Sequence, residues 1–404
     1  MLDHLRSSLH FVLYLVFAGF ALSSAMTSEF YGYRVWGAFA VVAFLGAGAF
    51  AVFSHRLAFW LALGLGSAAP LGVLIFHRDA AAEDFTAAPW TWSAQPDVWV
   101  IERSARLLLA HGTPYVDVNA LGRAPDVNDY TPYGPLMTVF GLPRALFGDS
   151  PLTDARIMFA LVAVAAVVLS LRLLGRPRIP VLAAQLAAVS PLTLLTTTTS
   201  GEDVAVLALI GLTATLVVTK RHGWAAVVAA AVVSVKLIAL PAIVVLVVFM
   251  LGRKHIALFT AVLAGVNLPV LLVDPHAFVE HAIRFPAGGA QVTSPASSPF
   301  PGHLLTELGP AGHGAALALL VVAGLAMVAW LLVRRPVTAA DAFWRVVVGM
   351  SAAILLMPAS RFGYLVYPTA LIGLSVFFRS VERVRSESRG AAAITTRVTI
   401  TNAG

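Results

Sequence analysis

The stretch GAALALLVVAGLAMVAWLLV, residues 314–333, decides the structural class of this chain. It contains no charged side chain, and Arg334 and Arg335 follow it directly. An α-helix of about 20 apolar residues crosses a hydrocarbon core that is about 30 Å thick, whereas a charge at its centre would be costly. The stretch therefore predicts a membrane-spanning helix with a basic anchor at one end.

Similar apolar stretches recur along the whole chain. Hydrophobic residues make up 59% of the 404 positions and charged residues only 12%, which excludes a soluble fold of this size. The N-terminal stretch resembles a signal peptide, but its apolar part is long enough to remain as a helix, and further spans follow. We expect an all-α polytopic membrane protein with about twelve transmembrane helices, at residues 10–26, 33–53, 57–76, 156–174, 180–198, 203–219, 223–235, 237–251, 256–273, 314–333, 342–357 and 364–379.

The basic residues fall mainly on one side of these spans. If the N-terminus is cytoplasmic, the inner segments hold 17 basic and four acidic residues, and the outer segments hold 10 basic and 16 acidic residues. Lys and Arg collect on the cytoplasmic side of membrane proteins, so this orientation is favoured. The formal charge of +7 comes from short clusters between apolar runs, which indicates topology signals and no nucleic-acid partner. Cys is absent, which excludes disulfides and thiolate metal sites.

One apolar stretch, residues 224–251, has basic clusters at both ends. A single crossing would place these clusters on opposite sides of the membrane. A break at Lys236, with Pro241 weakening the helix nearby, gives two short helices and brings Lys236 towards the outer face. The alternative is one long tilted helix in which the Lys236 side chain reaches the interface.

The outer side of the protein carries most of the polar residues. Its two large loops are residues 77–154 and 274–312, and the first holds 10 of the 16 outer acidic residues. A channel or a coupled transporter would carry polar groups within its spans, and these spans are nearly free of charge. We therefore expect an enzyme with an extracytoplasmic site. Residues 287–302 are rich in Gly, Ser and Pro and predict a mobile loop, and residues 380–404 predict a disordered tail.

Two helices are predicted within the first outer loop. Residues 96–111 have apolar positions on one face, Pro at the start and Gly112 at the end, which indicates an amphipathic helix lying on the membrane. Glu102 lies off the apolar stripe. Residues 136–148 are too short to span comfortably and predict a second interfacial helix.

Several short motifs resemble those of the polytopic GT-C glycosyltransferases, specifically the polyprenyl-phosphate-mannose-dependent mannosyltransferases of actinobacteria that act on phosphatidylinositol mannosides. The likeness covers roughly residues 57–380, so residues 1–56 look like an N-terminal addition to a catalytic module at 57–379. The motifs are Asp97 in the first outer loop, the turn His111-Gly112-Thr113-Pro114-Tyr115, the entry Tyr130-Thr131-Pro132-Tyr133-Gly134-Pro135, the step Asp154-Ala155-Arg156, Lys236 in SVKLIALP, and the turn Ser360-Arg361-Phe362-Gly363-Tyr364.

The resemblance implies a lipid-linked sugar phosphate as donor and an inverting transfer of mannose to a hydroxyl of a glycolipid or glycan. Such a transfer needs a general base on the sugar face opposite the leaving phosphate. Asp97 is the leading candidate, although an Asp in the first turn of a helix is also stabilised by the helix dipole without a catalytic role. Asp79, Glu83 and Asp84 are the rival bases.

Cations should hold the leaving phosphate where its charge develops, and Lys236 and Arg361 are the candidates. An Arg at a helix end also anchors in lipid headgroups. Arg156 has a structural alternative, an ion pair with Asp154 or Asp149. Further candidates for substrate binding are Tyr130, Tyr133, Glu202, Asp203 and His303.

No cofactor is predicted. The spacing of Asp274, His276 and His281 matches no metal template, and a divalent cation held by carboxylates stays open. The expected partners are the polyprenyl-phosphate donor, a glycolipid or polysaccharide acceptor and the bilayer of the cell membrane. Two alternatives remain, an arabinofuranosyltransferase that uses polyprenyl-phosphate arabinose and a flippase for lipid-linked sugars.

Overall fold

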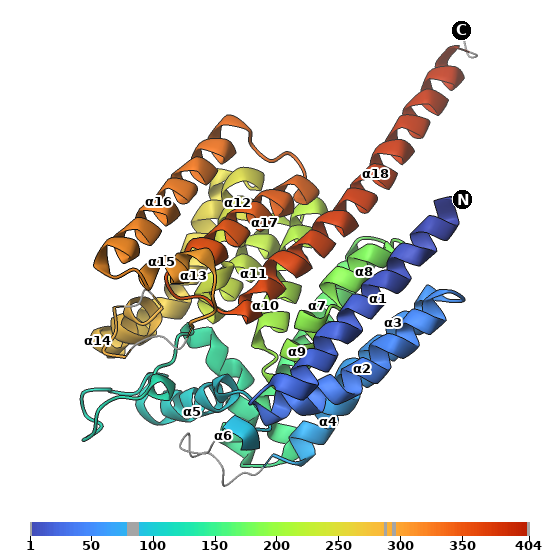
Figure 1. The fold of residues 1–404 in the computed structure, drawn as a ribbon. Helices are drawn as coiled ribbons and strands as arrows, with labels where there is room; N and C mark the ends of the chain where they lie inside the picture. The colour runs from blue at the N-terminus through green and yellow to red at the C-terminus, as the bar shows by residue number, and fades with distance from the viewer. Residues whose placement is uncertain (1, 79–88, 287–288, 293–295, 402–404) are drawn as a thin grey trace.

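The computed structural model describes residues 2–78, 89–286, 289–292 and 296–401. Within these ranges all regular secondary structure is helical, and Ser297 and Ser360 form an isolated parallel bridge. The helices stand side by side in a bundle (Figure 1). Both chain ends lie on the same side of the bundle, opposite α5 (Pro96–His111) and α6 (Leu142–Phe147).

Eight helical segments of the described chain are long and apolar enough to cross a membrane. This confirms an all-α polytopic membrane protein. The eight segments are formed by α1 (Leu2–Thr27), α2 (Tyr31–Ala51), α3 (His55–Leu63) continued by η1 (Gly64–Ala68) and α4 (Ala69–Phe76), α7 (Ala155–Leu173), α13 (Arg253–Val273), α16 (Pro310–Val333), α17 (Ala339–Leu356), and η8 (Phe362–Leu365) continued by α18 (Val366–Thr401).

The remaining expected spans are also helical but shorter. α8 (Val181–Ala187) and α9 (Pro191–Thr199) bend by 41° and make a ninth span if they are taken as one. The others are α10 (Glu202–Val218), α11 (His222–Val235) and α12 (Leu240–Met250). The twelve apolar stretches of the sequence therefore all correspond to helices, although by length only eight or nine qualify as spans.

Helix α10 forms the centre of the bundle. Most of its side chains are buried, and it packs against α7, α11, α12 and α18. α13 and α16 lie at the other extreme, because only 6% of the most apolar window of each is buried. Such wide apolar exposure indicates that these two helices face lipid.

The break at Lys236 is confirmed. α11 ends at Val235, Lys236 has extended backbone angles (φ −149°, ψ 121°), and the turn η6 (Leu237–Ala239) leads into α12. Pro241 occupies the first turn of α12, where its missing N–H costs no helical hydrogen bond. The alternative of one long tilted helix is therefore wrong.

The N-terminal helices form a separate apolar cluster with the bent pair. Trp36 of α2 is fully buried, and its indole donates to the carbonyl of Gly66 at 3.0 Å. The cluster includes Val189, between α8 and α9, and Leu194 of α9. The division into residues 1–56 and 57–379 stays a prediction. α18 continues as helix to Thr401, through the segment for which the polar sequence predicts disorder.

Helix α5 has the predicted bounds and ends at Gly112 in the left-handed conformation (φ 73°). The expectation that Glu102 lies on a polar face of this helix is wrong, because its carboxylate is fully buried and pairs with Arg78 and Arg144. The second predicted helix is divided at Gly141 into η4 (Pro135–Phe140) and α6. The remaining short elements are η2 (Pro89–Thr91), η3 (Val127–Asp129), η5 (Pro151–Thr153), α14 (Pro275–Val279), η7 (Glu280–Arg284) and α15 (Pro301–Thr306).

Candidate active site

Asp97 lies in the first turn of α5 and is half-buried. The Tyr133 hydroxyl donates to its Oδ1 at 2.6 Å. Burial first, and then the nearby carboxylates of Asp97 and Glu202, raise the pKa of Tyr133 well above its ordinary value. Tyr133 therefore stays protonated and remains a donor. Asp97 Oδ2 has no hydrogen-bond partner within the described parts of the chain and is available to a substrate.

Tyr133 is held in place by the break after α11. The backbone N–H of Gly134 donates to the carbonyl of Val235 at 3.1 Å, which satisfies a carbonyl that the end of α11 leaves free. A Cβ atom on Gly134 would lie 2.2 Å from the carbonyl oxygen of Ser234, so only glycine allows this approach. The same contact brings the Tyr133 ring beneath the Lys236 ammonium, 5.4 Å from the ring centroid.

Lys236 is paired with two carboxylates at the start of α10. Its Nζ lies 2.6 Å from Asp203 Oδ1 and 3.3 Å from Glu202 Oε1. Tyr367 of α18 also donates to Asp203. All three charged side chains are largely buried. The break in one span is thus joined to two neighbouring helices through a compact charged cluster.

Arg361 stands in the turn between α17 and α18. Its guanidinium makes no hydrogen bond or ion pair with any residue that the structure describes. Burial lowers its pKa, but the charge of Asp97 and the nearby hydroxyls of Tyr364 and Tyr133 together more than offset this effect, so the pKa is raised above its ordinary value. Arg361 keeps an exposed surface although it lies deep enough to be desolvated. A cation of this kind can receive an anionic ligand beside Asp97.

Besides the candidate Tyr133, three tyrosines that were not candidate site residues complete the cluster. Tyr33 of α2 and Tyr364 before α18 lie close enough to Asp97 and Arg361 for these charges to act on their hydroxyls. With Tyr133 and Tyr367, four of the eight tyrosines gather here. The available signal was a Tyr at the outer end of several unrelated spans, which is also typical of interfacial anchors.

The structure favours the structural alternative for Arg156 over a role in substrate binding. Arg156 is fully buried, forms a bidentate pair with Asp154, and donates to the carbonyls of Ser93 and Thr198. These contacts occupy all its guanidinium nitrogens, so it is not available to a ligand and the structural alternative holds. Arg78 also belongs to this buried network, because its guanidinium lies 2.8 Å from Asp154.

Tyr130 and His303 lie outside the Asp97 cluster. Tyr130 is 1% exposed, stacks on Phe285 with ring centroids 4.5 Å apart, and donates to Glu280 at 3.4 Å. His303 has its Nδ1 3.1 Å from the carbonyl oxygen of Pro358 and fastens α15 to the turn that carries Arg361. Neither residue contacts the charged side chains around Asp97.

Two further expectations concern the rival bases and a metal site. The rival bases Asp79, Glu83 and Asp84 lie outside the described residues. No group of three or more His, Asp or Glu side chains in the described chain could hold a metal ion.

The sequence profile of glycosyltransferase family 87 matches residues 130–358, which is more than half of the chain. The chain belongs to glycosyltransferase family 87. The family match contains Tyr133, the Glu202–Asp203 pair and Lys236. Arg361 lies just after its end, and Asp97 lies well before its start at residue 130. No curated protein and no solved structure matches the chain. Family membership and the apolar helices together identify a membrane glycosyltransferase.

Proposed function

We propose that this family 87 member transfers mannose from polyprenyl-phosphate mannose to a hydroxyl of a glycolipid or glycan, with inversion at the anomeric carbon. The observation that carries the proposal is that Asp97, held by Tyr133, lies near enough to Arg361 for their charges to interact, while Arg361 has no ion-pair partner among the described residues. A base and a cation are the two charges that such a transfer requires. The motifs shared with the mannosyltransferases support the choice of donor.

In this reaction Asp97 Oδ2 accepts the proton of the acceptor hydroxyl while the acceptor oxygen bonds to the anomeric carbon. The bond between that carbon and the phosphate oxygen breaks, and polyprenyl phosphate leaves with the bonding electrons. Inversion follows because the base and the leaving group lie on opposite faces of the sugar. Arg361 stabilises the phosphate where the negative charge grows. Asp97 then releases its proton to water.

We assign Lys236 a different role from that of Arg361 in binding the donor. Its ammonium already forms ion pairs with Glu202 and Asp203, so it attracts the phosphate from a distance and does not contact it. The carboxylates of this pair are suited to accept hydrogen bonds from sugar hydroxyls. Removal of Lys236 would leave two buried carboxylates without their cation, which destabilises a protein by about 3–5 kcal/mol.

The donor is tested with purified protein in lipid nanodiscs. Radiolabelled polyprenyl-phosphate mannose and polyprenyl-phosphate arabinose are supplied separately with a crude glycolipid acceptor. We expect label in the glycolipid from the mannose donor and an inverted linkage in the product. Transfer from arabinose alone would replace the proposed donor. Headgroup movement across liposomes without transfer from either donor would favour a flippase.

We also propose that the site faces the extracytoplasmic side of the cell membrane. The chain has no Cys, so single cysteines can report sidedness without a background. Asn119→Cys in the exposed outer loop should react with a membrane-impermeant maleimide in intact cells, and Arg335→Cys should react only after lysis. The reverse pattern would invert the proposed orientation.

A further inference from the structure

A second polar site lies at the other end of α10, away from the candidate active site. Glu202 opens α10, and Lys220 follows close after its last residue, Val218. A helix of this length extends about 25 Å, at 1.5 Å per residue. A shallow pocket of about 530 Å³ occupies this far end, formed by residues 220–224, Val227, Lys254, His255 and Leu258.

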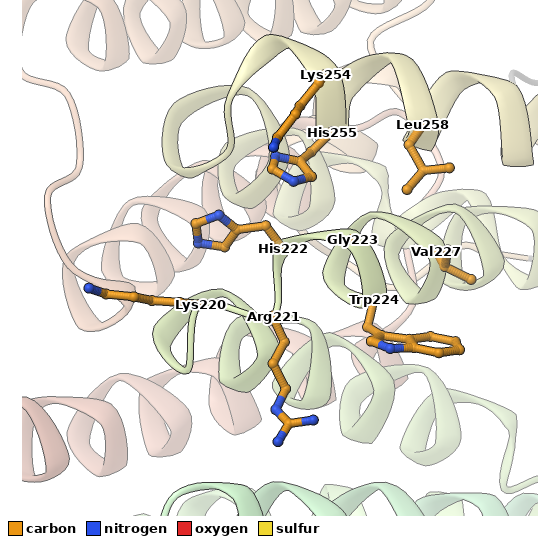
Figure 2. A pocket seen from close by; sticks show the side chains of 9 residues that line it. All are labelled: Lys220, Arg221, His222, Gly223, Trp224, Val227, Lys254, His255 and Leu258. Carbon is orange, nitrogen blue, oxygen red and sulfur yellow. The ribbon is translucent and has the colours of Figure 1, made fainter.

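The pocket has two chemically different parts, which Figure 2 shows. Lys254, His222 and His255 lie at one end, and Lys220 stands beyond His222 with its ammonium turned away from Lys254. The imidazole rings of His222 and His255 meet edge to face at 5.3 Å. The formal charges that line the pocket are all positive and include no carboxylate. This end is therefore suited to a phosphate group.

The other part of the pocket is apolar and open. Trp224 is 65% exposed and Leu258 is 37% exposed, and Val227 lies between them. Leu258 belongs to α13, one of the two helices whose apolar surface is left to lipid. An exposed Trp beside basic residues at the end of a span is typical of the headgroup layer of a membrane. A free phosphate ion would make no use of this wall, whereas a lipid would cover it with its acyl chains.

We propose that this pocket binds the headgroup of an anionic phospholipid, on the membrane face opposite Asp97. Lys254, His222 and His255 contact the phosphate, Lys220 adds positive charge at the rim of the pocket, and the acyl chains lie along Trp224 and the exposed face of α13. Basic residues near membrane ends also act as topology signals, but that role requires no pocket and no selection among headgroups. Selection among headgroups therefore separates the two roles.

The test is native mass spectrometry of the purified full-length chain. The protein is titrated with phosphatidylglycerol, with phosphatidylcholine, and with inorganic phosphate. We expect retained phosphatidylglycerol in preference to phosphatidylcholine. One basic residue at an anionic membrane surface is worth about a fivefold change in affinity, so Lys220→Ala/Lys254→Ala should weaken phosphatidylglycerol binding about thirtyfold. Lys254→Ala alone should weaken it about fivefold.

The matched control is Arg334→Ala/Arg335→Ala, which removes two exposed cations from the end of α16 without touching the pocket. This control should bind lipid as the wild type does. Equal retention of both phospholipids by the wild type, or equal losses in the two double variants, would overturn the proposal. Displacement of phosphatidylglycerol by millimolar inorganic phosphate would instead assign the pocket to a free anion and overturn the lipid assignment.

Discussion

Asp97→Asn is the sharpest perturbation of the candidate active site. The amide has nearly the same size and can still accept the Tyr133 hydrogen bond through its oxygen. It cannot accept the acceptor proton. The substitution therefore removes the proposed chemical role and leaves the local geometry in place.

The size of the effect distinguishes a base from a helix-capping residue. A positioned general base contributes about 10²–10⁴-fold, so kcat should fall by that factor. The stability terms are much smaller. Loss of a carboxylate from the first turn of a helix costs about 0.3–1 kcal/mol. Weakening one charge-assisted hydrogen bond costs about 1 kcal/mol, and relief of repulsion between Asp97 and Glu202 acts in the opposite direction.

The assay measures kcat and KM with radiolabelled donor, together with the thermal midpoint in detergent. Asp117→Asn is the control, because it makes the same change at an exposed position in the same loop. We expect the control to keep wild-type kcat. If Asp97→Asn kept more than about a tenth of wild-type kcat, a loss far below that expected for a general base, Asp97 would not be the base. A loss of activity that only followed a lowered midpoint would point to a capping role.

Four other perturbations test the remaining groups. Arg361→Ala should raise the donor KM much more than Arg361→Lys, and equal effects in a donor titration would remove the phosphate role. Arg78→Ala should destabilise the protein by about 3–5 kcal/mol in thermal melts, because it leaves the buried network of Glu102 and Asp154 one cation short. Arg106→Ala, in an exposed pair, should cost at most about 1 kcal/mol in the same melts. Burial lowers the pKa of His281 below 6.5, so the folded protein favours the neutral imidazole. This preference stabilises the fold fully above pH 6.5 and is lost as the pH falls below it. His281→Gln should therefore flatten the decline of the thermal midpoint between pH 7 and 5. Gly134→Ala should cost about 1–3 kcal/mol and reduce turnover, because its Cβ meets backbone, and an unchanged kcat would show that the Tyr133 position does not depend on this contact.

The sequence was sufficient for the class of fold and for the break at Lys236. Both follow from local rules, because a span needs about 20 apolar residues and basic clusters at both ends of one stretch require an even number of crossings. The bounds of α5 were also predictable, since Pro96 and Gly112 fix its two ends through backbone geometry alone.

Only the tertiary structure shows which charged side chains are paired within the protein and which have no ion-pair partner among the described residues. Arg156 and Arg361 are both Arg residues at helix ends in the sequence, yet one is enclosed by Asp154 and backbone carbonyls and the other has no such partner among the described residues. Glu102 likewise lies off an apolar stripe but is buried against Arg78. Local patterns cannot settle these cases, because the pairing partner of a charge comes from a distant part of the chain and is fixed only when the helices pack.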